Sequence, residues 1–297
     1  MTENSVSIRV PATSANLGPG FDAVGLAVSI FATVHITLAP DPRGSRPDPM
    51  RRMITSAVRA AYQRAGNHAP PGIDIEVESE IPLGRGLGAS AAARAAGIIG
   101  ANELMGRPLD DAAMLEVGTE LEGHADNVAP ALYGGLQVSA VDGSHVARVA
   151  VPLPGGLHCV GFVPEFSMPT HETRNLLPKR LSRQDAVFNS SRAALLVAAL
   201  STGQWDALNV ATEERLHQHP RSELFPAMFD FFQAALTAGA FGAYLSGGGS
   251  TIMSLCDAAH AEASRDALVQ AAARFAIEGD PFIVDPCPTG AEIVETR

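Results

Sequence analysis

The chain has 297 residues and a formal net charge of −11. Its length predicts either two lobes or one large domain. Hydrophobic residues make up 46% of the chain and charged residues 18%, which allows a packed core and argues against a disordered chain. The acidic balance repels phosphate backbones and anionic lipid, so we expect no nucleic-acid or membrane partner. A small anionic ligand remains compatible, because backbone amides bind phosphate without a basic protein.

The three cysteines, Cys159, Cys256 and Cys287, are widely spaced and form no Cys-x-x-Cys pair. This spacing argues against a disulfide framework or a structural zinc site and predicts a cytoplasmic protein. The first residues contain no basic segment and no long apolar run, so we expect neither a signal peptide nor a membrane span.

Apolar residues recur with strand and helix periods along the chain. We expect strands over residues 6–10, 24–38 (one long strand or a bent pair), 73–77, 136–141, 158–163, 241–245, 251–255 and 282–284. We expect helices over residues 50–65, 89–105, 109–121, 183–201, 205–215, 224–238 and 258–276. Prolines and glycines over residues 40–49 predict a surface loop. Because strands and helices do not alternate strictly, the expected fold class is α+β, with a boundary near residues 151–156 that separates lobes 1–150 and 151–297.

The most informative stretch lies between a predicted strand and a predicted helix. Its residues are Pro82, Leu83, Gly84, Arg85, Gly86, Leu87, Gly88, Ala89 and Ser90. Alternating glycines let the backbone approach a ligand closely, and the next helix offers unpaired N–H groups and a positive dipole end. These features predict a polyphosphate cradle in which the Ser90 hydroxyl faces a Mg²⁺ ion. A plain glycine-rich turn with Ser90 as a helix cap is the alternative.

Two familiar nucleotide motifs fit this stretch poorly. A Walker loop is excluded, because no Gly-Lys-Ser/Thr sequence ends it. A dinucleotide fingerprint matches the letters Gly84, Gly86 and Ala89, but the preceding strand alternates apolar and polar residues instead of being buried on both faces. The acidic residue at the expected distance, Glu103, falls in a helical run and not at the end of a strand.

Two further loops join predicted strands. One runs from Ser246 to Thr251 and reads Ser-Gly-Gly-Gly-Ser-Thr, which indicates either a flexible hairpin turn or a second loop facing phosphate or substrate. The other, near the start of the chain, contains Asn16 and Asp22 among glycines and prolines. Short polar side chains in such a loop are typical of Asx turns.

Together and in this order, the three loops resemble the motifs of the GHMP kinase superfamily and, within it, the homoserine kinase family. PATSANLGPGFDAVGLAV is similar to the first motif, IPLGRGLGASAAA to the phosphate loop and LSGGGST to the third motif. EGHADNVAPALYGG, MPTHETRNLLP and RLHQHPRSELFP extend the resemblance over essentially the whole chain. It implies ATP-dependent phosphorylation of the side-chain hydroxyl of L-homoserine, on the route to threonine. It also implies a homodimer whose subunits each have an S5-like amino-terminal lobe, a ferredoxin-like carboxy-terminal lobe and an active site between them.

The resemblance also implies roles for the nucleotide end of the site. Residues Pro82 to Ser90, with Gly248 and Gly249, would surround the ATP phosphates. Ser90 and Glu122 would hold Mg²⁺, and a carboxylate just before Gly123 at a helix end is a suitable hard oxygen ligand. Glu120 competes for this role, and a solvated helix-end glutamate is the alternative interpretation of Glu122.

At the substrate end, the resemblance implies that Asn16, Asp22 and Asn127 line an amino-acid pocket. Asp22 suits the substrate ammonium and Arg221 its carboxylate, since a guanidinium binds a carboxylate with two hydrogen bonds. Arg174 would contact the substrate and stabilise charge on the transferring phosphoryl group. Thr170 stands where mevalonate-type relatives have an aspartate base, so we assign no base.

The sequence departs from the family pattern at two places. Ala89-Ser90 stands where the phosphate loop usually has two serines, and Gly249-Ser250-Thr251 stands where the third motif usually reads Gly-Pro-Thr. Loss of the proline predicts a more flexible loop. Two alternatives therefore stay open: a GHMP kinase that acts on another small alcohol, and a non-catalytic ligand-sensing protein on the same scaffold.

Overall fold

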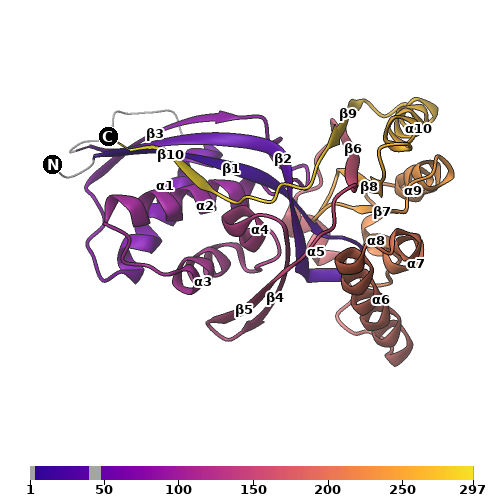
Figure 1. Ribbon diagram of the computed structural model, residues 1–297, viewed down its shortest axis with the longest axis horizontal. Helices are drawn as coiled ribbons and strands as arrows, with labels where there is room; N and C mark the ends of the chain where they lie inside the picture. The colour runs from indigo at the N-terminus through magenta and orange to yellow at the C-terminus, as the bar shows by residue number, and fades with distance from the viewer. Residues whose placement is uncertain (1–3, 40–47, 297) are drawn as a thin grey trace.

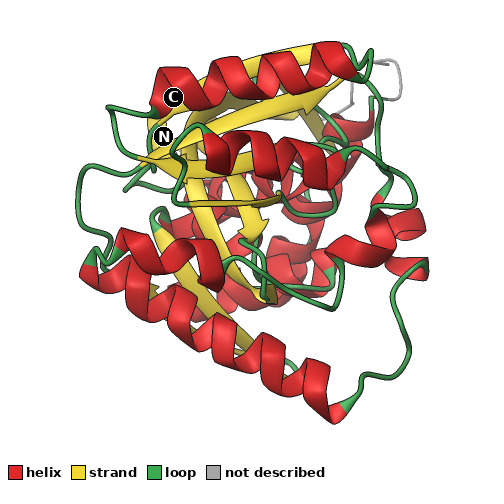
Figure 2. Ribbon diagram, turned by 90° about the vertical axis from the view of Figure 1, so that its right-hand side faces the viewer, coloured by secondary structure: helices red, strands yellow, loops and turns green. Residues whose placement is uncertain are grey.

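The computed structural model describes residues 4–39 and 48–296. The predicted surface loop over residues 40–49 therefore lies mostly outside the described residues. Within them, the strands gather in two antiparallel sheets, and helices pack against both (Figures 1 and 2). No helix in this part of the chain is long and apolar enough to cross a membrane.

The first sheet is built on two long neighbouring strands, β1 (Ser5–Asn16) and β2 (Gly20–Ala39). β2 is one continuous strand along which Ala32, Val34 and Ile36 are buried and alternate with more exposed residues, so one face packs on the core. The strand order is β10-β1-β2-β4-β5, and β3 pairs with the second half of β2. The other strands are β3 (Gly72–Ser79), β4 (Leu136–Asp142), β5 (His145–Val151) and β10 (Glu292–Thr296).

Four helices belong to this half: α1 (Pro49–Arg64), α2 (Ala89–Leu104), α3 (Asp111–Glu122) and α4 (Val128–Tyr133). The Asp48 side chain caps α1 by accepting a hydrogen bond from the Met50 amide at 2.9 Å. α2 packs closely against α1, and a Cβ added at Gly97 would stand 2.7 Å from the Ile54 carbonyl oxygen. Gly97 of α2 therefore allows the two helices to approach closely.

The second sheet has the order β7-β8-β6-β9. Its strands are β6 (His158–Pro164), β7 (Gly242–Leu245), β8 (Ile252–Cys256) and β9 (Gly279–Val284). The helices α9 (Met228–Thr237) and α10 (Ala261–Arg274) pack against this sheet and against each other. The remaining helices are α5 (Thr170–Asn175), α6 (Arg183–Thr202), the 3₁₀ helix η1 (Trp205–Ala207), α7 (Leu208–Ala211) and α8 (Gln218–Arg221).

The two halves are tied together by a shared core and by the last strand. Tyr244 and Met253 of the second sheet belong to the same hydrophobic cluster as Ile8 and Val34 of the first. After β9 the chain returns along the molecule, and β10 pairs with β1, so the first and last described strands lie side by side in the first sheet (Figure 1). Loops from both halves are therefore held against each other.

The predicted helix over residues 205–215 is wrong beyond Ala211. The Glu214 carboxylate accepts hydrogen bonds from the amides of Leu216, His217 and Gln218, and so caps the start of a separate short helix, α8. The predicted helix over residues 224–238 begins only at Met228. The sequence prediction also missed α4, α5, β5 and β10, which are short or largely exposed.

Candidate active site

The glycine loop connects β3 to α2, and it is held by the two other motif loops. The Thr13 amide donates to the Leu87 carbonyl at 3.2 Å, and the Thr251 amide donates to the Arg85 carbonyl at 3.0 Å. Gly86 has a φ of 82°, and an added Cβ would stand 2.2 Å from the Ser246 carbonyl oxygen. The position therefore requires glycine both for its backbone conformation and for this close approach. α2 begins directly after Gly88, so its first amides face the cavity beside the loop.

The Ser246–Thr251 loop is anchored along its length. The Ser246 hydroxyl donates to the Gly86 carbonyl at 2.7 Å and also contacts the Ser14 hydroxyl at 2.8 Å. The Gly247 amide donates to the Ala15 carbonyl at 3.0 Å. Ser250, at the position of the absent proline, is fully buried and donates its hydroxyl hydrogen to the Phe166 carbonyl at 2.6 Å. These contacts make the Ser246–Thr251 loop a fixed wall of the cavity rather than a free hairpin turn.

Asn16 at the end of β1 shapes the first motif. Its amide nitrogen donates to the Gly247 carbonyl at 2.9 Å, and its amide oxygen accepts from the Asp22 amide at 3.0 Å. The second contact spans six residues, so it is not the Asx turn that the sequence offered as an alternative, which closes over two residues. Asn16 therefore joins the first and third motifs and fixes the backbone of Asp22, while it also lines the cavity.

Ser90 and Glu122 meet at the start of α2 and the end of α3. The Ser90 hydroxyl donates to Glu122 Oε1, and Arg94 Nη1 forms an ion pair with Glu122 Oε2. Burial lowers the pKa of the Arg94 guanidinium. Ser90 and Glu122 both line the cavity and present two hard oxygen donors side by side, which is the donor type that Mg²⁺ prefers. The competitor Glu120 instead lies near Arg64, with 3.9 Å between Arg64 Nη1 and its Oε1.

Asp22 and Arg174 form a pair with two hydrogen bonds, at 2.6 and 3.0 Å. They come from β2 and α5, far apart in the sequence. Hydrogen bonds to Asp22 raise the pKa of Arg174, so the guanidinium stays charged. The Arg174 guanidinium lies 5.4 Å from the Phe21 ring centroid, and that of Arg221 lies 5.6 Å from it, so one aromatic ring neighbours both cations.

Arg221 is a buried cation whose guanidinium is fixed by two hydrogen bonds. Its Nη1 donates to His217 Nδ1 at 2.9 Å and to the Gly247 carbonyl at 3.0 Å. His217 Nε2 donates to the Gly18 carbonyl at 2.8 Å, so the two contacts fix a neutral imidazole. Burial lowers the pKa of His217 and lowers that of Arg221 to about 10. Among the described residues, Arg221 Nε has no hydrogen-bond partner, although Arg221 lines the cavity.

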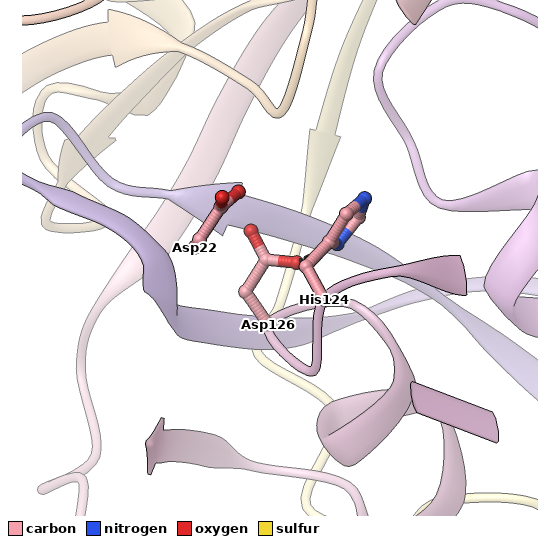
Figure 3. Close-up of side chains that lie close together, drawn as sticks. All are labelled: Asp22, His124 and Asp126. Atoms are coloured by element: carbon pink, nitrogen blue, oxygen red, sulfur yellow. Dashed lines mark hydrogen bonds and ion pairs between the residues drawn. The ribbon is translucent and has the colours of Figure 1, made fainter. Parts of the chain in front are cut away.

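His124, Asp126 and Asn127 follow α3 and complete this end of the cavity. His124 Nδ1 lies 2.5 Å from Asp126 Oδ1, and Asn127 accepts a hydrogen bond from the Thr13 hydroxyl at 2.8 Å. Figure 3 shows Asp22, His124 and Asp126 turned toward one another, and one potential ligand atom of each lies within 4.8 Å of the others. Such a cluster suits a cation, either a metal ion or an ammonium group.

The cavity brings most of the predicted site residues together. Those at its surface are Asn16, Asp22, Pro82, Leu83, Gly84, Gly86, Gly88, Ala89, Ser90, Glu122, Asn127, Arg174, Arg221, Gly248 and Gly249. Leu87 is instead buried in the core, and Arg85 donates from its side chain to the Glu165 carbonyl. Thr170 begins α5, but its side chain lies outside the described part of the chain. Sequence reasoning gave no role to His124, Asp126, Phe21 or Arg94, although the first three lay inside quoted motifs.

Comparison with known proteins gives consistent matches over both halves. The GHMP kinases N terminal domain matches residues 52–135, and the GHMP kinases C terminal domain matches residues 196–274. A homoserine kinase of Moorella thermoacetica is 39% identical over 295 residues, which cover 97% of this chain and 99% of the relative. A homoserine kinase of Deinococcus radiodurans is 42% identical over 84% of each chain. The crystal structure of a homoserine kinase from Cytophaga hutchinsonii aligns over 99% of this chain and 98% of its own, with a TM-score of 0.88 and 28% identity. The predicted α+β fold class is confirmed.

Proposed function

Because the chain belongs to the GHMP kinase family, we propose that it transfers the terminal phosphoryl group of ATP to the side-chain hydroxyl of L-homoserine. The products are O-phospho-L-homoserine and ADP, and the reaction is a step toward threonine. ATP is the donor expected of this family. The relatives named homoserine kinase match nearly the full length of the chain, which supports this substrate over other small alcohols.

One observation carries the proposal: a phosphate-type loop and an amino-acid-type pocket share one cavity. The two ends touch at Gly88, where an added Cβ would stand 3.1 Å from Asn127 Oδ1. Phosphoryl transfer needs the donor phosphate and the acceptor hydroxyl side by side in a fixed geometry, because catalysis depends mostly on positioning and on charge stabilisation. The cavity provides both binding ends with rigid, hydrogen-bonded walls.

The charges at the substrate end match an amino acid. Asp22 and Asp126 are suited to an ammonium group, and Arg221, whose side chain lines the cavity, is suited to a carboxylate. In the free protein Asp22 is engaged by Arg174. A substrate ammonium that takes over Asp22 would release the Arg174 guanidinium to face the transferring phosphoryl group. Substrate binding and completion of the catalytic charge would then be coupled.

At the nucleotide end, the glycine loop and the first amides of α2 would hold the ATP phosphates. Gly248 and Gly249 line the same cavity, with Gly249 next to Gly86 of the glycine loop, and would also contact the phosphates. Ser90 and Glu122 fit a Mg²⁺ ion, since both are oxygen donors at the cavity surface and already lie within hydrogen-bonding contact of each other. When bound, the ion would neutralise charge on the phosphates.

We assign no general base. The transferring group can be attacked by a well-placed hydroxyl without a strong base, if charge stabilisation and alignment are provided. Asn127 and Asn16 would align the substrate, while Arg174 would stabilise the charge that develops during transfer. A homodimer and a cytoplasmic location belong to the same proposal, since they accompany small-molecule kinases of amino-acid biosynthesis in this family.

The test is an ADP-release assay with Mg²⁺-ATP in which L-homoserine, L-threonine, L-serine and mevalonate are offered separately. We expect L-homoserine to give the highest kcat/KM. Turnover of another alcohol in its place would show a related kinase with a different substrate, a possibility raised by the changed third motif. Calorimetric binding of L-homoserine without any turnover would show a ligand-sensing protein instead.

A further inference from the structure

Arg94 occupies a position that the proposed reaction does not require. It lies one helical turn after Ser90 on α2, so both side chains leave the helix on the same face. Glu122 lies between them: its Oε1 accepts from the Ser90 hydroxyl, and its Oε2 pairs with Arg94 Nη1. Of these three residues, only Ser90 and Glu122 are among the described residues that line the cavity.

The Arg94–Glu122 pair is too buried to be an ordinary surface ion pair. The side chain of Arg94 is 19% exposed and that of Glu122 is 10% exposed. Within the described residues, Arg94 Nε is buried without a hydrogen-bond partner. Burying a guanidinium with an unsatisfied N–H has a desolvation cost that a single carboxylate partner offsets only in part. A role in stability alone therefore explains this arginine poorly.

The Arg94–Glu122 pair also lowers the negative charge that the Ser90–Glu122 site offers to a divalent cation in the free protein. A glutamate beside a serine offers one negative charge, but Arg94 cancels it. One carboxylate oxygen is held by Arg94, and the other remains beside Ser90 at the cavity surface. Mg²⁺ gives up its water reluctantly and usually binds one or two carboxylates together with substrate phosphates. The negative charge missing from this site would therefore have to come from the nucleotide.

We infer that Arg94 is a positioning residue that orients Glu122 and neutralises it, so that the protein binds a divalent cation weakly until nucleotide phosphates are present. This inference rests on the metal role proposed above for Ser90 and Glu122. Replacing Arg94 with a neutral residue removes the positive charge from the pair and leaves the Glu122 carboxylate uncompensated. The same site should then attract a divalent cation without nucleotide.

The test measures Mn²⁺ binding directly, from the electron paramagnetic resonance signal of free Mn²⁺, with and without ADP. No turnover is needed. We expect Arg94→Met and Arg94→Gln to bind Mn²⁺ without nucleotide at least tenfold more tightly than the wild type. Arg94→Lys keeps the positive charge and should stay close to the wild type. Fluorescence of the single tryptophan, Trp205, during thermal unfolding checks that each variant is folded.

Two results would overturn the inference. One is nucleotide-free Mn²⁺ affinity in Arg94→Met and Arg94→Gln within twofold of the wild type. The other is a gain of affinity that persists in the double variant Arg94→Met/Glu122→Gln, because the ion would then be bound elsewhere.

Glu122→Gln alone separates this inference from its premise. If it leaves Mn²⁺ binding with ADP unchanged, the metal role of Glu122 is wrong and the inference falls with it. If it weakens that binding while the Arg94 variants change nothing, only the role of Arg94 is wrong. Phosphorylation of homoserine is measured in a separate assay, by ADP release. Failure of the proposed reaction is therefore distinguishable from failure of the Glu122 metal role and from failure of the Arg94 role.

Discussion

Two alanine substitutions in the glycine loop test whether its contact with the third motif controls the phosphate site. Gly84 and Gly86 both have positive φ angles, of 68° and 82°. Alanine in this conformation costs roughly 1–2 kcal/mol at either position. At Gly84 the nearest atom to an added Cβ is Ser167 Cβ at 4.0 Å, so Gly84→Ala adds backbone strain without a clash. It is therefore the matched control for Gly86→Ala.

At Gly86 the added Cβ would stand 2.2 Å from the Ser246 carbonyl oxygen and 3.0 Å from that of Gly249. Restoring an ordinary contact requires the two loops to separate by about 1 Å, and a misplacement of this size costs about 10²-fold in rate. The Ser246 hydroxyl bond to the Gly86 carbonyl would be lost in the same movement. We expect Gly84→Ala to lower kcat/KM by no more than about 5- to 30-fold, because this is the factor that corresponds to its roughly 1–2 kcal/mol of backbone strain. Gly86→Ala should lower it by about 10²- to 10³-fold.

The assay is ADP release with L-homoserine and Mg²⁺-ATP, with ATP affinity measured by calorimetry and folding checked by thermal unfolding. Both variants should remain folded at the assay temperature. If kcat/KM of Gly86→Ala lies within threefold of that of Gly84→Ala, the contact between the two loops does not set the geometry of the phosphate site, and the reasoning is refuted.

Three further predictions follow from the site. Ser90→Ala and Glu122→Gln should each lower turnover by about 10²-fold without unfolding the protein, because each removes an oxygen donor at the proposed metal site. Wild-type rates of ADP release in these variants would show that Ser90 and Glu122 are not metal ligands. Asp22→Asn should raise the KM for homoserine by about 10- to 100-fold, because hydrogen bonds to charged groups contribute about 1.5–3 kcal/mol, and an unchanged KM would contradict the ammonium assignment. Burial lowers the pKa of His217 from 6.5, so below that pH the unfolded chain binds a proton that the folded chain does not, and stability falls as the pH falls. His217→Asn should flatten this decline between pH 6.5 and 5 in urea unfolding, and an equally steep decline would refute the buried neutral state.

The parts of the fold with a clear local pattern could be predicted from the sequence, α2 from an apolar, alanine-rich run and β3 from alternating apolar and polar residues. The helix predicted over residues 89–105 is α2 (Ala89–Leu104), and the strand predicted over residues 73–77 lies within β3. β10 could not be predicted, because it is short, carries charged residues and owes its existence to pairing with β1 at the opposite end of the chain. α8 was missed for a similar reason: its start depends on the Glu214 carboxylate, a contact that no periodicity records.

The candidate site divides in the same way. The three motif loops carry local signals in glycine spacing and turn residues, but it was the resemblance to the GHMP kinases that implied one shared site before the structure was known. Asp126 and His124 carry no such signal, since their importance comes from facing Asp22 of a distant strand. Arg94 looks like any polar residue in a helix, and only the end of α3 beside it gives it a partner. The catalytic roles of all these residues stay predictions.

The expected flexibility of the third motif also depends on tertiary contacts. Serine in place of proline gives the backbone more freedom in isolation. In the folded chain the Ser250 hydroxyl donates to the Phe166 carbonyl, and Thr251 contacts the Arg85 carbonyl through both its amide and its hydroxyl. These hydrogen bonds restrain the loop where a proline would have restrained it through its ring.

Identification of the reaction product tests the central claim most directly. The purified protein is incubated with L-homoserine and Mg²⁺-ATP, and the mixture is followed by ³¹P nuclear magnetic resonance. We predict ADP and, in equal amount, a single new phosphomonoester whose phosphorus couples to the side-chain methylene protons of homoserine. Formation of ADP with inorganic phosphate alone, or no consumption of ATP by the folded protein, would contradict the proposal.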